Sequence, residues 1–348
     1  MATVRIGVIG AGWWAVENHI PALKSFDDVE VSAICRLGRD ELRRFQDHFQ
    51  IPFGTEDYRE LLSLPGLDGV IVCSPHHLHY EHAKAALERG LHVVCEKPMT
   101  LDAGEARELR DLAETQARHF LIPYGWSYSE MAEQALRSVR AGLIGEIQHV
   151  HCHMASALRE LFSGQESWVG AESLVRPELG TWANPAHGGG WAHGQLTHAL
   201  GLLFLLSGLE PESVFGITGL SSTGADLFNA IACRFRNGAT GTIGGAATMP
   251  VGSAYQVDVR LYGTKGMLLV DVERPRMEVR CHDGAVVRAE VTHPPGGYSC
   301  VAPLRRFVDL IQGKPVENLS SARVGAATVA LIDAALRSAR SGVAEPAV

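Results

Sequence analysis

The chain has 348 residues, of which 46% are hydrophobic and 20% charged, a composition typical of a globular protein with one large domain or two ordinary ones. Lys and Arg number 31 against 39 Asp and Glu, and the net charge of −8 argues against nucleic acid or an anionic membrane as a partner. No apolar stretch is long enough for a transmembrane helix, and the N-terminus lacks a secretory signal pattern. Because the seven cysteines form no C-x-x-C pair, we expect reduced thiols in a cytoplasmic protein.

The first third of the chain alternates short apolar runs with helical segments. Three helices are expected: one begins near Asp40, a second ends at Gly90, and a third begins after Thr100. Strands are expected at 4–9, 29–35, 51–55 and 67–75, between Gly90 and the turn at Glu96–Pro98, and at 119–124. This alternation predicts a doubly wound parallel sheet, which binds ligands beyond the carboxyl ends of its strands.

After residue 124 the pattern changes to strands that follow one another with turn signals between them. It predicts an α+β unit built on an open, mostly antiparallel sheet, ending with helices at 302–313 and 321–339. We therefore expect two units, a doubly wound one at 1–123 and an α+β one at 124–348.

The turn after the first strand reads G-A-G-W-W-A, a G-x-G-x-x-A pattern. In such a turn one glycine bends the chain, the next lets the backbone approach a pyrophosphate, and the small third residue packs helix on strand. The free N–H groups of the following helix favour an anion. The alternative is a plain glycine turn. We predict dinucleotide binding by Gly10, Gly12, Trp13, Trp14 and Ala15.

The end of the second strand carries Arg36, with Arg39 nearby, where an NAD-preferring site usually has an Asp or Glu. A guanidinium suits the 2′-phosphate of NADP(H), so NADP(H) is favoured and NAD(H) remains possible. The alternative is that either arginine is a solvated surface charge.

Polar residues follow the fourth and fifth strands. We expect Ser74, Pro75, His76 and His79 to make cofactor or helix-start contacts, because these imidazoles lack the spacing of a zinc site and no metal is predicted. The pair Glu96 and Lys97 follows the fifth strand, where a desolvated lysine near a nicotinamide assists proton transfer. The alternative for Lys97 is an exposed lysine in a turn.

A glycine triplet at 188–190 precedes the segment W-A-H-G-Q-L-T-H at 191–198. If a helix begins near Trp191, His198 lies one turn after Gly194 and can act as an acid or base; the alternative is a buried core histidine. Candidate substrate contacts are Trp126, Trp182 and Trp191, whose rings each offer a large apolar face with one polar group, together with His193 and Gln195. The tryptophans are alternatively ordinary core aromatics.

Together these segments resemble the glucose-fructose oxidoreductase / inositol dehydrogenase / rhizopine-catabolism (Gfo/Idh/MocA) family. The resemblance covers nearly the whole chain and rests on the following sequences in order: G-A-G-W-W-A, H-I-P-A-L at 19–23, S-P-H-H-L-H at 74–79, C-E-K-P at 95–98, the glycine triplet with His198, F-V-D-L-I-Q-G at 307–313 and A-L-R-S-A at 335–339. It implies an NAD(P)-dependent dehydrogenase or reductase acting on a CH–OH group of a sugar, glycoside or cyclitol. It also implies a dinucleotide-binding Rossmann domain at 1–123 and a substrate-binding and oligomerisation domain at 124–348. Lys97 and His198 would line the reaction site, and the open sheet would form a homodimer or homotetramer.

Three positions depart from the family pattern. Gly194 stands where the family often has an Asp four residues before the histidine, His76 replaces a common Asn, and Ala183 follows Trp182 in place of an Arg. Without that Asp the histidine lacks its orienting carboxylate, and His193 or Gln195 is a possible substitute. Two alternative functions therefore stay open: a glycoside hydrolase that transiently oxidises C3 of the sugar, and a non-catalytic dinucleotide-binding homologue.

Overall fold

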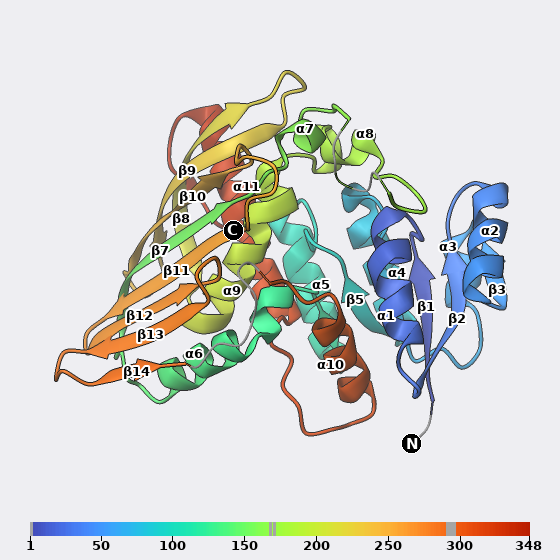
Figure 1. The fold of residues 1–348 in the computed structure, drawn as a ribbon, viewed down its shortest axis with the longest axis horizontal. Helices are drawn as coiled ribbons and strands as arrows, with labels where there is room; N and C mark the ends of the chain where they lie inside the picture. The colour runs from blue at the N-terminus through green and yellow to red at the C-terminus, as the bar shows by residue number, and fades with distance from the viewer. Residues whose placement is uncertain (1–2, 167–168, 170–171, 290–296) are drawn as a thin grey trace.

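The computed structural model describes residues 3–166, 169, 172–289 and 297–348, which form two sheets with helices packed on them (Figure 1). The first sheet is parallel and consists of Val4–Ile9 (β1), Val29–Cys35 (β2), Phe53–Thr55 (β3), Gly69–Val72 (β4), His92–Cys95 (β5) and Phe120–Leu121 (β6). Its strand order β3-β2-β1-β4-β5-β6 reverses direction beside β1, as in a Rossmann fold. The predicted doubly wound sheet is confirmed.

Helices connect these strands and cover the sheet. They are Ala15–His19 (a π-helical turn) continuing into Ile20–Lys24 (α1), then Arg39–Phe49 (α2), Tyr58–Leu62 (α3), His79–Glu88 (α4) and Ala103–Thr115 (α5). The expected start of α5 after Thr100 is wrong by two residues. The Asp102 side chain accepts a hydrogen bond from the Glu105 N–H at 3.0 Å and caps the helix, while Thr100 bonds to the Asp102 carbonyl.

The second sheet is mostly antiparallel, as predicted. Its described strands run in the order β14-β13-β12-β11-β7-β10-β9-β8-β15, and β7 and β10 form its parallel pair. They are Ile147–Ala155 (β7), Pro211–Leu220 (β8), Asp226–Phe235 (β9), Thr240–Ala246 (β10), Gln256–Gly263 (β11), Gly266–Asp271 (β12), Arg276–Cys281 (β13), Val286–Arg288 (β14) and Glu345–Pro346 (β15). Alternating burial along β9 shows that one face packs inward and the other is open.

Helices cover the inward face of this sheet (Figure 1). They are Glu130–Arg140 (α6), Thr197–Ser207 (α9) and Ala322–Ser341 (α11). Shorter helices lie in the long connection before α9, at Arg159–Phe162 (α7), Leu179–Trp182 (α8) and Ala192–Leu196, the last a π-helical turn. The predicted continuous helix from Trp191 therefore begins with a wider turn than an α-helix.

The C-terminal helices also contact the first sheet. Val301–Ile311 (α10) places Leu304, Phe307 and Val308 in the same core cluster as β1 and β4. Helix α11 places Ala326 and Val329 among the side chains of β5 and β6. The two sheets are thus joined by buried apolar contacts. No helix in the part of the chain that the structure describes is both long and apolar enough to cross a membrane.

Candidate active site

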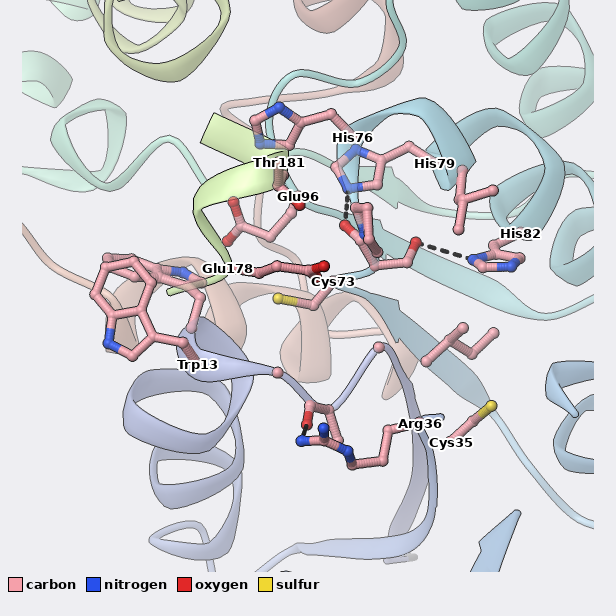
Figure 2. Close-up of a pocket in the computed structure, with 18 of the residues that line it drawn as sticks. Trp13, Cys35, Arg36, Cys73, His76, His79, His82, Glu96, Glu178 and Thr181 are labelled. Atoms are coloured by element: carbon pink, nitrogen blue, oxygen red, sulfur yellow. Dashed lines mark hydrogen bonds between the residues drawn. The ribbon is translucent and has the colours of Figure 1, made fainter. Parts of the chain in front are cut away.

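A cavity of about 390 Å³ opens at the carboxyl edge of the parallel sheet (Figure 2). The turns after β1, β2, β4 and β5 line it, and residues 177–182 of the connection before α9 close one side. Figure 2 shows Arg36 at the opposite end of this cavity from His76 and His79. An elongated cavity at this edge matches the place where doubly wound sheets bind dinucleotides.

The turn after β1 is shaped for close backbone approach. Gly10 has φ +85°, and a Cβ there would lie 2.4 Å from the Ser74 nitrogen, so only glycine fits between the two turns. A Cβ at Gly12 would meet only the Gly10 oxygen at 3.9 Å, which leaves open space beside the start of the helix. The first N–H groups of a helix lack partners within it and attract an anion. The residues present therefore fit the pyrophosphate of a nicotinamide dinucleotide.

Arg36 lines the cavity and Arg39 does not. The Arg36 guanidinium donates to the Ala11 carbonyl at 3.2 Å and forms an ion pair with Glu41. The Arg39 side chain is 81% exposed and pairs with Glu56 at 3.1 Å. Of the two arginines expected at the ribose, Arg36 is the one that faces the cavity.

The imidazoles after β4 hold the local backbone. His79 lies between two carbonyl oxygens, with Nδ1 2.6 Å from Pro98 and Nε2 2.8 Å from Ser74. His82 Nδ1 lies 2.9 Å from Ser74 Oγ, and His76 Nδ1 lies 3.0 Å from the Gly188 carbonyl. These contacts tie the turn after β4 to those after β5 and before α9. Among the described residues no group of His, Cys, Asp and Glu is arranged to hold a metal ion.

Glu96 and Lys97 are both buried at the end of β5. Burial acts to raise the pKa of Glu96, but the His19 ring at 2.8 Å and nearby positive charges hold it at about 2. The Lys97 ammonium donates to the Gly194 carbonyl at 3.0 Å and lies 5.0 Å from the Trp182 ring centroid. Burial lowers the pKa of Lys97, against the attraction of Glu96. A lysine held in this way can give or take a proton more readily than an exposed one.

His198 lies on α9 inside a group of aromatic rings. The ring centroids of Trp126, Tyr298 and Tyr124 are 5.7, 5.3 and 6.0 Å from that of His198, each close to edge-on. Burial, together with the charge of Lys97, lowers the pKa of His198 well below its usual value. The neutral imidazole is therefore the resting form, as a proton acceptor requires.

The space beside Gly194 is filled by an aromatic ring. A Cβ at this position would lie 2.6 Å from Cε1 of Phe162, a fully buried side chain on α7. The ring therefore occupies the volume that a side chain at 194 would enter. Position 194 therefore contributes to the site its main-chain oxygen, which accepts from Lys97, and no side chain that could orient His198.

Most of the expected cofactor residues line the cavity, and all of the expected substrate residues except Trp182 lie outside its lining. The lining includes Gly10, Gly12, Trp13, Trp14, Arg36, Ser74, Pro75, His76, His79, Glu96, Lys97 and Trp182. Outside that lining are Ala15, Arg39, Trp126, Trp191, His193, Gln195 and His198. Lys97 connects the two groups through Gly194. Trp191 is 0% exposed, so its ring offers no stacking face in this structure.

Other residues of the site carried no recognisable sequence signal. Glu178 and Thr181 line the cavity from the connection before α9, and Tyr58 lines it from α3. Tyr298 reaches His198 from the segment before α10. Each is distant in sequence from the motif it meets, and none belongs to a recognisable pattern.

Comparison with known proteins identifies the class. Residues 4–124 match the NAD-binding Rossmann fold of the GFO/IDH/MocA oxidoreductase family, and residues 132–269 match the C-terminal domain of the same family. The chain therefore belongs to the Gfo/Idh/MocA family and is an oxidoreductase, which confirms the resemblance and the enzyme class expected from the sequence.

Several individual proteins are similar to this chain. An uncharacterised oxidoreductase of Rhizobium meliloti is 27% identical over 76% of this chain and 73% of its own length. A D-glucoside 3-dehydrogenase of Escherichia coli is 31% identical over 41% of each chain. A glycosyl hydrolase family 109 protein of Streptomyces filamentosus is 30% identical over 49% of this chain and 36% of its own length. The last two matches thus span less than half of the relatives.

Solved structures share the fold over the full chain. An oxidoreductase domain protein from Kribbella flavida superimposes with a TM-score of 0.81 at 21% identity, covering 100% of both chains. A levoglucosan dehydrogenase in complex with NADH and L-sorbose gives a TM-score of 0.78 at 20% identity, again covering 100% of both chains.

Proposed function

We propose that this oxidoreductase transfers hydride between a nicotinamide cofactor and a hydroxyl or ketone carbon of a sugar, glycoside or cyclitol. The observation that carries the proposal is the buried Lys97 ammonium, which lines the dinucleotide cavity and also bonds to the segment leading to His198. The names of the D-glucoside 3-dehydrogenase and the levoglucosan dehydrogenase support a sugar substrate.

The cofactor supplies the hydride acceptor or donor when bound. Lys97 then hydrogen-bonds and polarises the reacting oxygen, and its position at the end of β5 keeps that oxygen beside the cavity. During oxidation His198 takes the proton of the hydroxyl group while hydride leaves the carbon that bears this group. During reduction His198 returns the proton to the oxygen. Trp182, which is partly exposed and lines the cavity, is the candidate surface for the sugar ring, with His193 and Gln195 as further candidate contacts. Trp126 is only 4% exposed and offers little of its face.

The test is turnover by the Lys97→Ala enzyme. We expect kcat to fall by about 10²- to 10³-fold, because the reacting oxygen loses the donor that polarises it, while cofactor binding measured by fluorescence quenching is retained. Substrates are screened over polyols, sugars and glycosides by following the reduced nicotinamide. Lys84→Ala is the matched control, because this lysine pairs with Glu108 on the surface. Full activity of Lys97→Ala would remove Lys97 from the mechanism.

We also propose that NADP(H) is preferred, because Arg36 faces the cavity. Its pair with Glu41 opposes this preference, since the guanidinium has to exchange one anion for another. Separate titrations with NADPH and NADH test it. We expect Arg36→Ala to weaken NADPH binding about tenfold more than NADH binding, with Arg43→Ala, an exposed arginine on the following helix α2, as control. Tighter NADH binding by the wild type would contradict the preference.

A second candidate function is glycoside cleavage by transient oxidation at C3, favoured by the similarity to a glycosyl hydrolase family 109 protein. In that reaction the cofactor is reduced and then reoxidised, so release of the aglycone leaves the amount of reduced nicotinamide unchanged. A chromogenic glycoside separates the two functions. Tight cofactor binding without turnover on any of these substrates indicates the non-catalytic homologue instead.

A further inference from the structure

Tyr298 lies just before α10 and reaches into the site from outside the family motifs. Its ring packs directly on Gly125, where a Cβ would lie 2.8 Å from Cζ of Tyr298 and 2.3 Å from the Ser299 carbonyl oxygen. Trp126 contacts the same ring, with centroids 5.1 Å apart. The position of the phenol is therefore set by close packing on both sides.

The hydroxyl of Tyr298 contacts two groups that compete for its single proton. It donates to the Pro123 carbonyl at 2.7 Å, an acceptor that has no proton of its own to give. Nδ1 of His198 lies 3.3 Å from the same oxygen. Because the phenol proton is used by Pro123, this second contact is a hydrogen bond only when Nδ1 carries a proton and donates it.

The neutral imidazole has one proton, so a proton on Nδ1 leaves the lone pair on Nε2. The surrounding rings of Tyr124 and Trp126 restrict rotation of the imidazole. Position 194, from which the family often supplies a carboxylate, is a glycine blocked by Phe162. Tyr298 is the side chain for which the structure shows a hydrogen bond to His198.

We propose that Tyr298 is a positioning residue that holds His198 in the Nδ1–H tautomer, so that Nε2 is the nitrogen that exchanges the substrate proton. This inference rests on the proposed function, in which His198 is the proton acceptor. The neutral phenol of Tyr298, whose own proton is bound by the Pro123 carbonyl, therefore orients His198 in this chain. Gly194 has no side chain that could do so.

The test compares Tyr298→Phe with Tyr255→Phe. Tyr255 also packs on Trp126, at 5.8 Å between centroids, so its variant removes a phenol hydroxyl from the same cluster without removing the bond to His198. We expect Tyr298→Phe to lower kcat about 10- to 100-fold, as for loss of a group that orients another, with KM and cofactor affinity nearly unchanged. Tyr255→Phe is expected to keep the wild-type kcat. Equal losses in the two variants would overturn the proposal.

A second readout does not depend on turnover. Long-range ¹H–¹⁵N correlation of histidine-labelled protein reports which ring nitrogen is protonated, with the His198 signal assigned by its absence in His198→Asn. We expect Nδ1–H in the wild type and a mixture of tautomers in Tyr298→Phe. A proton on Nε2 in the wild type would overturn the assignment. If the wild type turns over no substrate, the proposed function fails, and the spectrum still decides the role of Tyr298.

Discussion

The space beside Gly194 and the ring of Phe162 are matched to each other. A Cβ built at position 194 would lie 2.6 Å from Cε1 of the fully buried Phe162 ring, which is closer than the two atoms can approach. A side chain can enter at 194 only if the ring moves, and dense packing makes such movement costly. The absence of a carboxylate at 194 is therefore part of a local packing arrangement that includes α7.

This pairing predicts strong coupling between the two positions. We expect Gly194→Asp alone to lower the free energy of unfolding by about 1–3 kcal/mol, because the new side chain overlaps the ring. In Gly194→Asp combined with Phe162→Ala, the cavity left by the ring receives the carboxylate. The double variant should therefore be more stable than the sum of the single effects predicts, by about 1 kcal/mol or more.

Urea unfolding of the four proteins in this cycle measures the coupling. Gly194→Ala separates the effect of volume from that of charge, since its Cβ meets the same ring atom. Additive effects within experimental error would show that Phe162 does not fill the space next to position 194.

Single residues with a local sequence signal were predictable, and residues brought in by the fold were not. Gly10, Gly12 and Lys97 follow strands, so topology alone placed them at the cavity. Phe162 and Tyr298 reach the site across long sequence separations, and a single sequence contains no information about which distant side chains meet. Arg39 was expected beside Arg36 because the two are close in sequence, but it points to Glu56.

At the scale of elements, α10 belongs by packing to the parallel sheet although it lies near the end of the chain. Leu304, Phe307 and Val308 are fully buried in the cluster that contains β1 and β4. Arg305 on the same helix pairs with Asp28 at 2.7 Å and is the main reason that the pKa of Asp28 is lowered to about 2. The division at residue 123 stays a prediction, and a fragment ending there would lack this covering helix.

The contribution of α10 is measurable through Phe307. Truncation to alanine removes a ring that is 0% exposed, and we expect a loss of about 3–5 kcal/mol in unfolding free energy. The matched control is Val343→Ala, whose side chain is 57% exposed and should change stability by less than about 0.5 kcal/mol. A loss below about 1 kcal/mol for Phe307→Ala would show that α10 is not part of the folded core.

Element type was predictable wherever the apolar pattern was strong. All six strands of the first sheet were expected because buried parallel strands are continuous apolar runs. Short elements such as β14 and β15 were missed, since three and two residues show no period. The wide turn at Ala192–Leu196 was also missed, because the hydrogen bonds of a π-helix leave no pattern in the sequence.

At the scale of the whole molecule, several of the sixteen histidines are buried in a neutral form. Burial lowers the pKa of His193 to about 4, and burial together with neighbouring charges lowers that of His82 to about 4. Both are less than a tenth exposed. In the unfolded chain the same side chains titrate near pH 6.5, so unfolding takes up protons between these values.

Stability should consequently fall in mild acid. Above pH 6.5 these groups are neutral in both states and have no effect on the pH dependence. Between pH 6.5 and 4 the unfolded state binds more protons, and we expect each group to remove up to about 1.4 kcal/mol per pH unit. Urea unfolding at pH 7.5, 6.5, 5.5 and 4.5 measures the slope. His82→Asn should make it shallower, and an unchanged slope would show that His82 does not titrate in this way.

The open face of the second sheet is the remaining large feature. Phe215, Ile217 and Phe228 point away from the helix-covered side and are 39%, 61% and 50% exposed. Among the described elements no helix covers this face (Figure 1). Exposed apolar side chains gathered on the uncovered face of a sheet are typical of an interface, and we propose that copies of the chain associate through it.

A charge placed on this face should separate the copies. We expect the wild type to form a dimer or tetramer, and Ile217→Asp to shift it toward the monomer, because association would bury an unpaired carboxylate. Light scattering during size-exclusion chromatography measures the mass against the 37.6 kDa of one chain. Val301→Asp changes a valine that is 47% exposed on α10, which packs on the first sheet, and should leave the mass unchanged. A monomeric wild type, or an Ile217→Asp variant of unaltered mass, would place the association elsewhere or exclude it.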